Sequence, residues 1–226
     1  MSHGGLNGWS VQRDFGAVSR GWVVRPLPDA REESRSGRGR YQRGRSGPTY
    51  FEARSCAAAH GANEHGGAPG HLALVAARAC YDTLMECGVA AKRDLKKGRT
   101  SPAVERLIEC NILLSGVGFE SGGLALAHAI ANGLTILPEC KAMHGEAVAF
   151  GLVVQLRLER APELDQVLEF CQRVGLPTTL EELGLDEITD ADLLSVADAT
   201  FKNERNMANE QTKVSRQKLV QLMCEA

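Results

Sequence analysis

The stretch from Ser115 to Gly151 constrains this 226-residue chain most, because it carries two histidines on two predicted helices. Apolar residues recur at helical spacing from 119 to 132, namely Phe119, Leu124, Leu126, Ala127 and Ile130. This spacing predicts a helix over 119–132, with Gly133 as its stop and Pro138 as a barrier to continuation. His128 lies well inside the predicted helix.

A second apolar run predicts a helix from about 143 to 160, with His144 in its first turn. The connection between the two helices is short, so they should be neighbours, and both imidazoles can face one cleft. Neutral imidazole is a common ligand of zinc and iron. An alternative stays open, because a lone histidine on an apolar face is more often a hydrogen-bonded core residue. The spacing also differs from the one-turn separation of an HExxH site.

This stretch resembles the metal-site region of glycerol dehydrogenases, in the iron-containing alcohol dehydrogenase superfamily. Their pattern is close to GVGFESGGLAxAHAIxNGL followed by an HGExVAFG helix. The chain matches at Gly116, Gly118, Phe119, Glu120, Ser121, Gly122, Gly123, His128, Asn132, Gly133, His144, Gly145, Glu146 and Gly151. The resemblance implies that His128 and His144 are two of three protein ligands of a catalytic metal, zinc or iron. Glu120 and Glu146 are candidates to orient an imidazole, with surface charge or helix capping as the open alternative.

The third ligand in the family is an aspartate four residues before the threonine of a TYFEAR run. In this chain the run is Thr49 to Arg54, and the aspartate position holds Arg45. A guanidinium only donates hydrogen bonds and stays positive, so it cannot bind a metal and repels one. The sequence therefore predicts two metal ligands and no further catalytic residue.

Residues 1–48 differ from the rest, with nine arginines, nine glycines and no lysine. Neither helical nor strand periodicity is present, so we predict a disordered Arg/Gly-rich segment there. An RNA-binding arm or a transit peptide is the alternative, and the acidic residues of the segment argue against the transit peptide. Residues 49–226 form the second predicted unit, a helical dehydrogenase-like metal-binding domain.

The predicted fold class is all-α, a bundle of about eight helices, because no run of alternating strand residues occurs from 50 to 226. Further helices are predicted at 72–88, at 102–115 after a Ser101 cap, at 162–174 before Gly175, at 190–201 and at 215–224. GVGFESGG follows a helix and lacks dinucleotide-loop spacing, so we interpret it as a tight turn between helices. Lys92 to Lys97 is predicted as a charged turn, and His60, His65 and His71 as exposed loop residues.

Composition limits the possible partners and compartment. The net charge of −2 does not suggest a nucleic-acid surface for the chain as a whole, and no apolar run reaches the length of a membrane span. No signal peptide is recognised. Seven cysteines without a CxxC pair favour buried thiols in a reducing cytoplasm, including Cys80 and Cys87 on one predicted helix face. We expect a small-molecule substrate, neither a nucleic-acid nor a membrane partner, and a possible homo-oligomer.

The resemblance implies NAD-dependent, metal-assisted oxidation of glycerol or a related polyol to a hydroxyketone. The family's NAD-binding α/β domain has no recognised counterpart in this sequence, so no cofactor-binding residue is predicted. The alternative is a non-catalytic truncated remnant, at most an oligomerisation partner of a complete enzyme.

We predict that the purified 226-residue chain does not oxidise glycerol with NAD. Positioning the nicotinamide supplies roughly 7–11 kcal/mol of the barrier, and no segment is recognised that would do so. Arg45 should also weaken metal binding. The measurement is NADH absorbance with added glycerol and zinc. Turnover that disappears in His128→Ala would show the prediction to be wrong.

Overall fold

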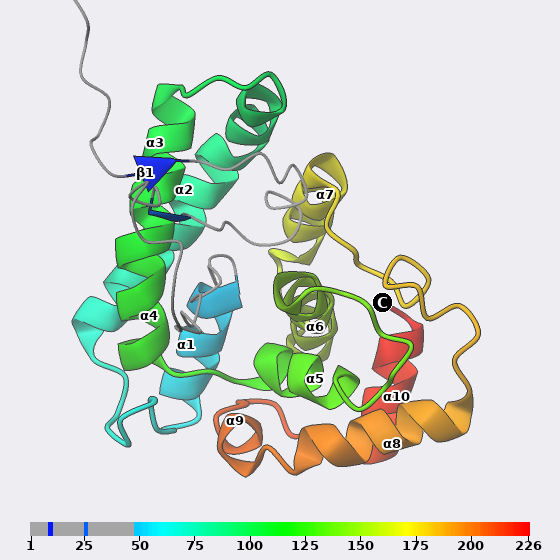
Figure 1. Cartoon of the computed structure of the whole chain (residues 1–226). Coiled ribbons are helices and arrows are strands. Elements are labelled where there is room, and N and C mark those ends of the chain that lie inside the picture. Colours follow the sequence, from blue (N-terminus) through cyan, green and yellow to red (C-terminus); the bar gives the residue numbers. More distant parts are fainter. Residues whose placement is uncertain (1–8, 11–24, 27–47) are drawn as a thin grey trace, which may run out of the picture.

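The computed structural model describes residues 9–10, 25–26 and 48–226, and its helical fold agrees with the predicted all-α class (Figure 1). The helical elements are α1 (Pro48–Ala58), α2 (His71–Lys96), α3 (Pro102–Glu109), the π-helical turn η1 (Cys110–Leu114), α4 (Ser115–Gly122), α5 (Leu126–Leu134), α6 (His144–Glu159), α7 (Leu164–Val174), α8 (Asp190–Phe201), α9 (Glu204–Ala208) and α10 (Arg216–Cys224). Residues 48–226, which the structure describes throughout, contain no strand.

Most of the predicted disordered segment, residues 1–48, lies outside the described residues, and so does Arg45. Two described pairs within it form two-residue strands, β1 (Trp9–Ser10) and β2 (Arg25–Pro26). They pair antiparallel, with Trp9 opposite Pro26. The prediction of an unstructured segment did not include this pairing.

Helix α5 is the centre of the core. Every residue of α5 except Asn132 is buried, as expected for a helix that is apolar on nearly all sides. Helices α6 and α8 pack against it, whereas α2, η1 and α4 pack together beside α1. Figure 1 shows α1 between these two groups, with α2 to α4 on one side and α5 to α10 on the other.

Among the residues that the structure describes, no single helix is both long and apolar enough to cross a membrane. The helical run 102–122 and helix α5 together have the length and apolar composition of a membrane span, but the chain bends by 97° at the break between them.

The structure corrects the predicted end of helix 72–88. Helix α2 continues to Lys96, so Lys92 to Lys97 is mostly helix and not a charged turn. Gly88 does not end the helix; a Cβ there would lie 2.8 Å from the Phe170 ring of α7. The Lys92 ammonium donates a hydrogen bond to the carbonyl of Val174, the last residue of α7. Glycine at 88 therefore serves helix packing.

The structure also corrects the Gly-rich run. Residues 115–122 are helix α4 and not a turn, and the predicted helix over 119–132 is broken at Gly123, where φ is +84°. A Cβ on Gly118 would lie 3.1 Å from the Cα of Ala77, and one on Gly122 would lie 2.7 Å from the Cβ of Ala53. These glycines let α4 approach α2 and α1 closely, and Gly123 makes the turn into α5.

Several predicted helix ends are confirmed. The Ser101 hydroxyl accepts from the backbone N–H of Val104 at 3.5 Å. Gly175 ends α7 in the left-handed region, with φ of 64°. Helices α6, α8 and α10 lie within one residue of their predicted bounds, whereas α1 and the five-residue α9 were not predicted.

Two glycines set the distance of α5 from its neighbours. A Cβ on Gly133 would lie 2.3 Å from the Thr200 hydroxyl oxygen of α8. A Cβ on Gly151 of α6 would lie 2.4 Å from the carbonyl oxygen of Ala127. Gly133 therefore does not stop the helix, which continues to Leu134, but permits close packing.

We predict that Gly151→Ala lowers the free energy of unfolding by about 1–3 kcal/mol, because a backbone carbonyl cannot move aside as a side chain can. Gly116→Ala is the matched control, since Gly116 is helical and a Cβ there meets nothing within 4 Å. It should raise stability by about 0.5–1 kcal/mol. Urea unfolding measures both, and equal effects would contradict the prediction.

The segment between α9 and α10 is held against α1 and its following loop by buried polar groups. The Asn209 side-chain amide donates to the Leu124 carbonyl at 2.7 Å and accepts from the Ala62 N–H at 3.0 Å. The neighbouring carboxyl group of Glu210 is buried and accepts from the Thr212 N–H at 3.0 Å. Burial raises the pKa of Glu210 from 4.5 to about 7.

Because the folded-state pKa of Glu210 lies above its unfolded value, its contribution is complete below about pH 4.5 and is lost as pH rises through about 7. We expect the wild-type chain to lose about 3 kcal/mol relative to Glu210→Gln between pH 4.5 and pH 8. The amide stays neutral and keeps an acceptor for Thr212. Denaturant unfolding of both proteins across this range is the measurement, and parallel pH profiles would refute the assignment.

Candidate metal centre

The structure brings His128 and His144 together. His128 is the third residue of α5, and His144 is the first residue of α6. Their ring centroids are 5.4 Å apart, with an angle of 51° between the ring planes. The close packing of α5 on α6 at Gly151 makes this pairing possible, although the two residues lie sixteen positions apart in the sequence.

A buried carboxylate from α1 fixes the orientation of His128. The Glu52 side chain is fully buried, and its Oε2 lies 2.5 Å from His128 Nδ1. Its Oε1 accepts from the backbone N–H groups of Ala125 at 2.9 Å and His128 at 3.0 Å. Glu52 therefore caps the start of α5 and also holds the imidazole that α5 carries.

This contact determines where the His128 imidazole carries its proton. A carboxylate accepts hydrogen bonds and does not donate them, so Nδ1 carries a proton, and Nε2 is the nitrogen that can present a lone pair to a metal. Nε2 is buried and has no hydrogen-bond partner among the described residues. A histidine that gives one N–H to a carboxylate and directs its other nitrogen elsewhere is arranged as in many metal sites.

The spacing of the rings fits a shared ion. Two imidazoles that bind one zinc ion at roughly 2.0–2.1 Å, with a tetrahedral angle between them, have ring centres about 5 Å apart. The 5.4 Å separation of His128 and His144 is close to that value. Among the described residues, no group of three or more His, Cys, Asp or Glu side chains is arranged to hold a metal. The position that resemblance gives to the third ligand, Arg45, lies outside the described residues.

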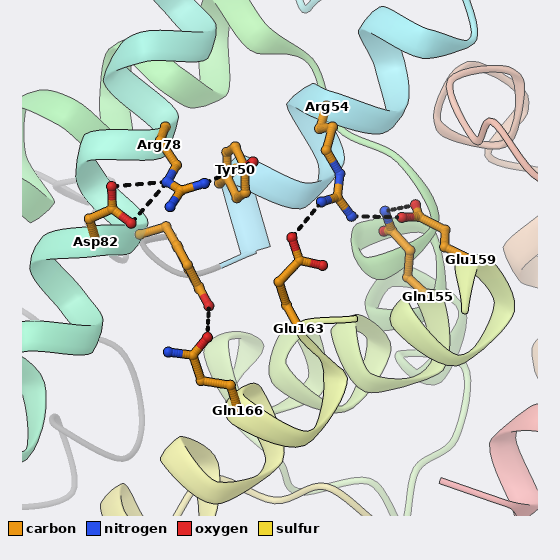
Figure 2. A network of polar contacts seen from close by, with 9 residues as sticks. Tyr50, Arg54, Arg78, Asp82, Gln155, Glu159, Glu163 and Gln166 are labelled. Atoms are coloured by element: carbon orange, nitrogen blue, oxygen red, sulfur yellow. Dashed lines mark hydrogen bonds and ion pairs between the residues drawn. The ribbon is translucent and has the colours of Figure 1, made fainter. Parts of the chain in front are cut away.

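A second set of polar contacts holds α1 against α6 and its C-terminal connection (Figure 2). The Arg54 guanidinium donates to Glu163 at 2.9 Å and to Glu159 at 3.2 Å. Gln155 donates to Glu159 at 2.8 Å, and its carbonyl accepts from the N–H of Ala127 at 3.0 Å. Helices α1, α5 and α6 are therefore linked by polar contacts in addition to the Glu52–His128 pair.

The other side chains that the sequence suggested have different roles. Glu146 caps α6 by accepting from the Met143 N–H at 2.8 Å, which is the capping alternative. Glu120 is exposed, as are His60, His65 and His71. Sequence reasoning did not identify Glu52. Its position between buried neighbours in the TYFEAR run was the available signal, because a carboxylate in a buried helix needs partners.

Comparison with known proteins supports the resemblance. No family model matches the chain. A glycerol dehydrogenase from Thermotoga maritima is 47% identical over 165 residues, which cover 72% of this chain and 45% of that protein. A glycolaldehyde reductase from Halobacterium salinarum is 41% identical over 165 residues, covering 72% of this chain and 45% of that protein.

A solved structure shares the fold. The glycerol dehydrogenase from Schizosaccharomyces pombe superposes with a TM-score of 0.74 at 37% identity, over 78% of this chain and 46% of that one. The chain spans about half the length of the relatives that it matches. By sequence and by fold, its helical part is a relative of the glycerol dehydrogenases.

Proposed function

We propose that this chain supplies the metal-binding half of a polyol dehydrogenase, which oxidises glycerol or a related polyol to a hydroxyketone with NAD as the hydride acceptor. The observation that supports the proposal most is the buried Nε2 of His128, which lies beside a second imidazole while Glu52 contacts the other ring nitrogen. The names of the relatives give the reaction class, since they include glycerol dehydrogenases and a glycolaldehyde reductase.

His128 and His144 are the proposed protein ligands, with zinc or iron as the metal. The chemistry that such an ion supplies when bound is Lewis acidity, which favours loss of the proton from a substrate hydroxyl. Glu52 acts on the first ligand: it holds the Nδ1 proton and thereby fixes the ring and its tautomer. Both imidazoles stand on helices packed against each other, so their separation is set by the core and not by a loop.

We predict that the chain binds one zinc ion and that His128→Ala and His144→Ala each weaken this binding at least about 10-fold. Isothermal titration calorimetry with zinc chloride measures the affinity, and thermal unfolding checks that each variant is folded. His71→Ala is the matched control, because His71 is exposed at the start of α2 and should bind zinc like the wild type. Unchanged affinity in both site variants would remove the proposal.

Glu52→Gln tests the positioning role within the same experiment. The amide keeps the shape but adds an N–H group where three donors converge, so it should lower zinc affinity by about 10–100-fold. Nitrogen-15 NMR of the His128 ring gives a readout that a merely structural role would not move. The wild-type ring should be protonated at Nδ1, whereas the variant ring should show a mixture of tautomers. Loss of affinity without a change of tautomer would contradict positioning through Nδ1.

Substrate class is tested with cobalt(II) in place of zinc. Glycerol should change the visible absorption of the cobalt-loaded chain if its hydroxyl reaches the ion. The same concentration of 1,2-dimethoxyethane, which has no hydroxyl group, should not. Equal responses to the two compounds would mean that the chain binds a metal but that the metal does not recognise a polyol hydroxyl.

A further inference from the structure

Two buried cysteines face each other across neighbouring helices. Cys80 lies in α2 and Cys110 is the first residue of η1, and their side chains are 0% and 2% exposed. The two Sγ atoms are 3.3 Å apart, and Cys110 Sγ is also 3.4 Å from the carbonyl oxygen of Cys80. A disulfide bond measures about 2 Å, so the sulfurs need to approach by roughly 1.3 Å.

Contacts of the residues next to Cys80 hold α2 in place against α4 and α1. One turn before Cys80, Ala77 packs against Gly118 of α4, where a Cβ would lie 3.1 Å from both the Cα and the Cβ of Ala77. Next to Cys80, the Tyr81 ring contacts Phe51 of α1, with centroids 5.0 Å apart. Cys110 begins a π-helical turn, a local departure from α-helix that often marks functional positions.

We propose that Cys80 and Cys110 form a reversible redox site, in which a small peroxide oxidises the two thiols to a disulfide that joins α2 to η1. The thiolate of one cysteine attacks a peroxide oxygen, forming a sulfenic acid as the O–O bond breaks. The second sulfur then attacks the sulfenic sulfur. Two S–H bonds are lost, one S–S bond forms, and hydrogen peroxide takes up two electrons and two protons to give two water molecules.

The two sulfurs are hydrogen-bonded to each other, so the S–H group of either one can stabilise the thiolate of the other. Whichever sulfur is deprotonated attacks the peroxide, and its neighbour then resolves the sulfenic acid.

The linkage would close a loop between residues 30 positions apart and fasten α2 to the helix that leads into α4. Because α2 also contacts α1 through Tyr81, the cross-link would stiffen the support of the helix that carries Glu52. Oxidation should therefore stabilise the chain and leave His128 and His144 in place, so this redox site is independent of the proposed metal function.

The test is peptide mapping of the native wild-type chain after hydrogen peroxide treatment. We expect one cross-linked peptide pair containing Cys80 and Cys110, about 2 Da lighter than the sum of the reduced peptides, and its reversal by dithiothreitol. The oxidised chain should melt about 5–10 °C higher than the reduced chain. Exposed Cys224 reports whether the peroxide has acted.

Cys80→Ser and Cys110→Ser should each abolish the cross-link and the shift in melting temperature. Cys87→Ser is the matched control, because Cys87 is buried in the same helix two turns further on and should leave both intact. The peptide map of the wild-type chain tests the proposal even if a cysteine variant does not fold. Oxidation of Cys224 with Cys80 and Cys110 still reduced, or cross-linking to other cysteines instead, would overturn the proposal.

Discussion

The buried carboxylate of Glu52 is the interaction on which the arrangement of the site depends. A buried carboxylate is costly unless hydrogen bonds replace its hydration, and Glu52 accepts from the Ala125 and His128 N–H groups and from the His128 ring. These bonds join α1 to the start of α5, just after the chain turns at Gly123. One side chain therefore sets both the beginning of the central helix and the orientation of the imidazole in it.

Glycines at the helix contacts fix how α5 packs against its neighbours. Gly151 lets α6 approach the Ala127 carbonyl of α5, and Gly133 lets α5 approach Thr200 of α8. These approaches leave little freedom for α5 to slide or rotate, because interiors pack at crystal-like density. The 5.4 Å separation of the two imidazole rings is then a property of helix packing, reinforced where Gln155 accepts from the Ala127 N–H.

Local signals in the sequence predicted much of this fold. The predicted bounds of α6, α8 and α10 agree with the structure, and the Ser101 cap and the Gly175 stop were confirmed. Glycine was the main source of error, since Gly88 and Gly133 look like helix stops but serve close packing. Glu52 could not be found from periodicity because its partner lies 76 residues away in the sequence. Only the folded core shows which distant polar groups meet.

The position of Glu52 also changes the charge expected at the site. Arg45 at the position of the third ligand led to the expectation that two neutral imidazoles bind a metal weakly, and that residue lies outside the described part of the chain. Within the described part, a buried carboxylate is hydrogen-bonded to one of the two rings. Charges in a poorly hydrated interior interact more strongly than in water, so the Glu52 carboxylate favours a cation at Nε2 through the ring. Arg54, the nearby guanidinium of α1, is engaged with Glu159 and Glu163 and so does not cancel this effect.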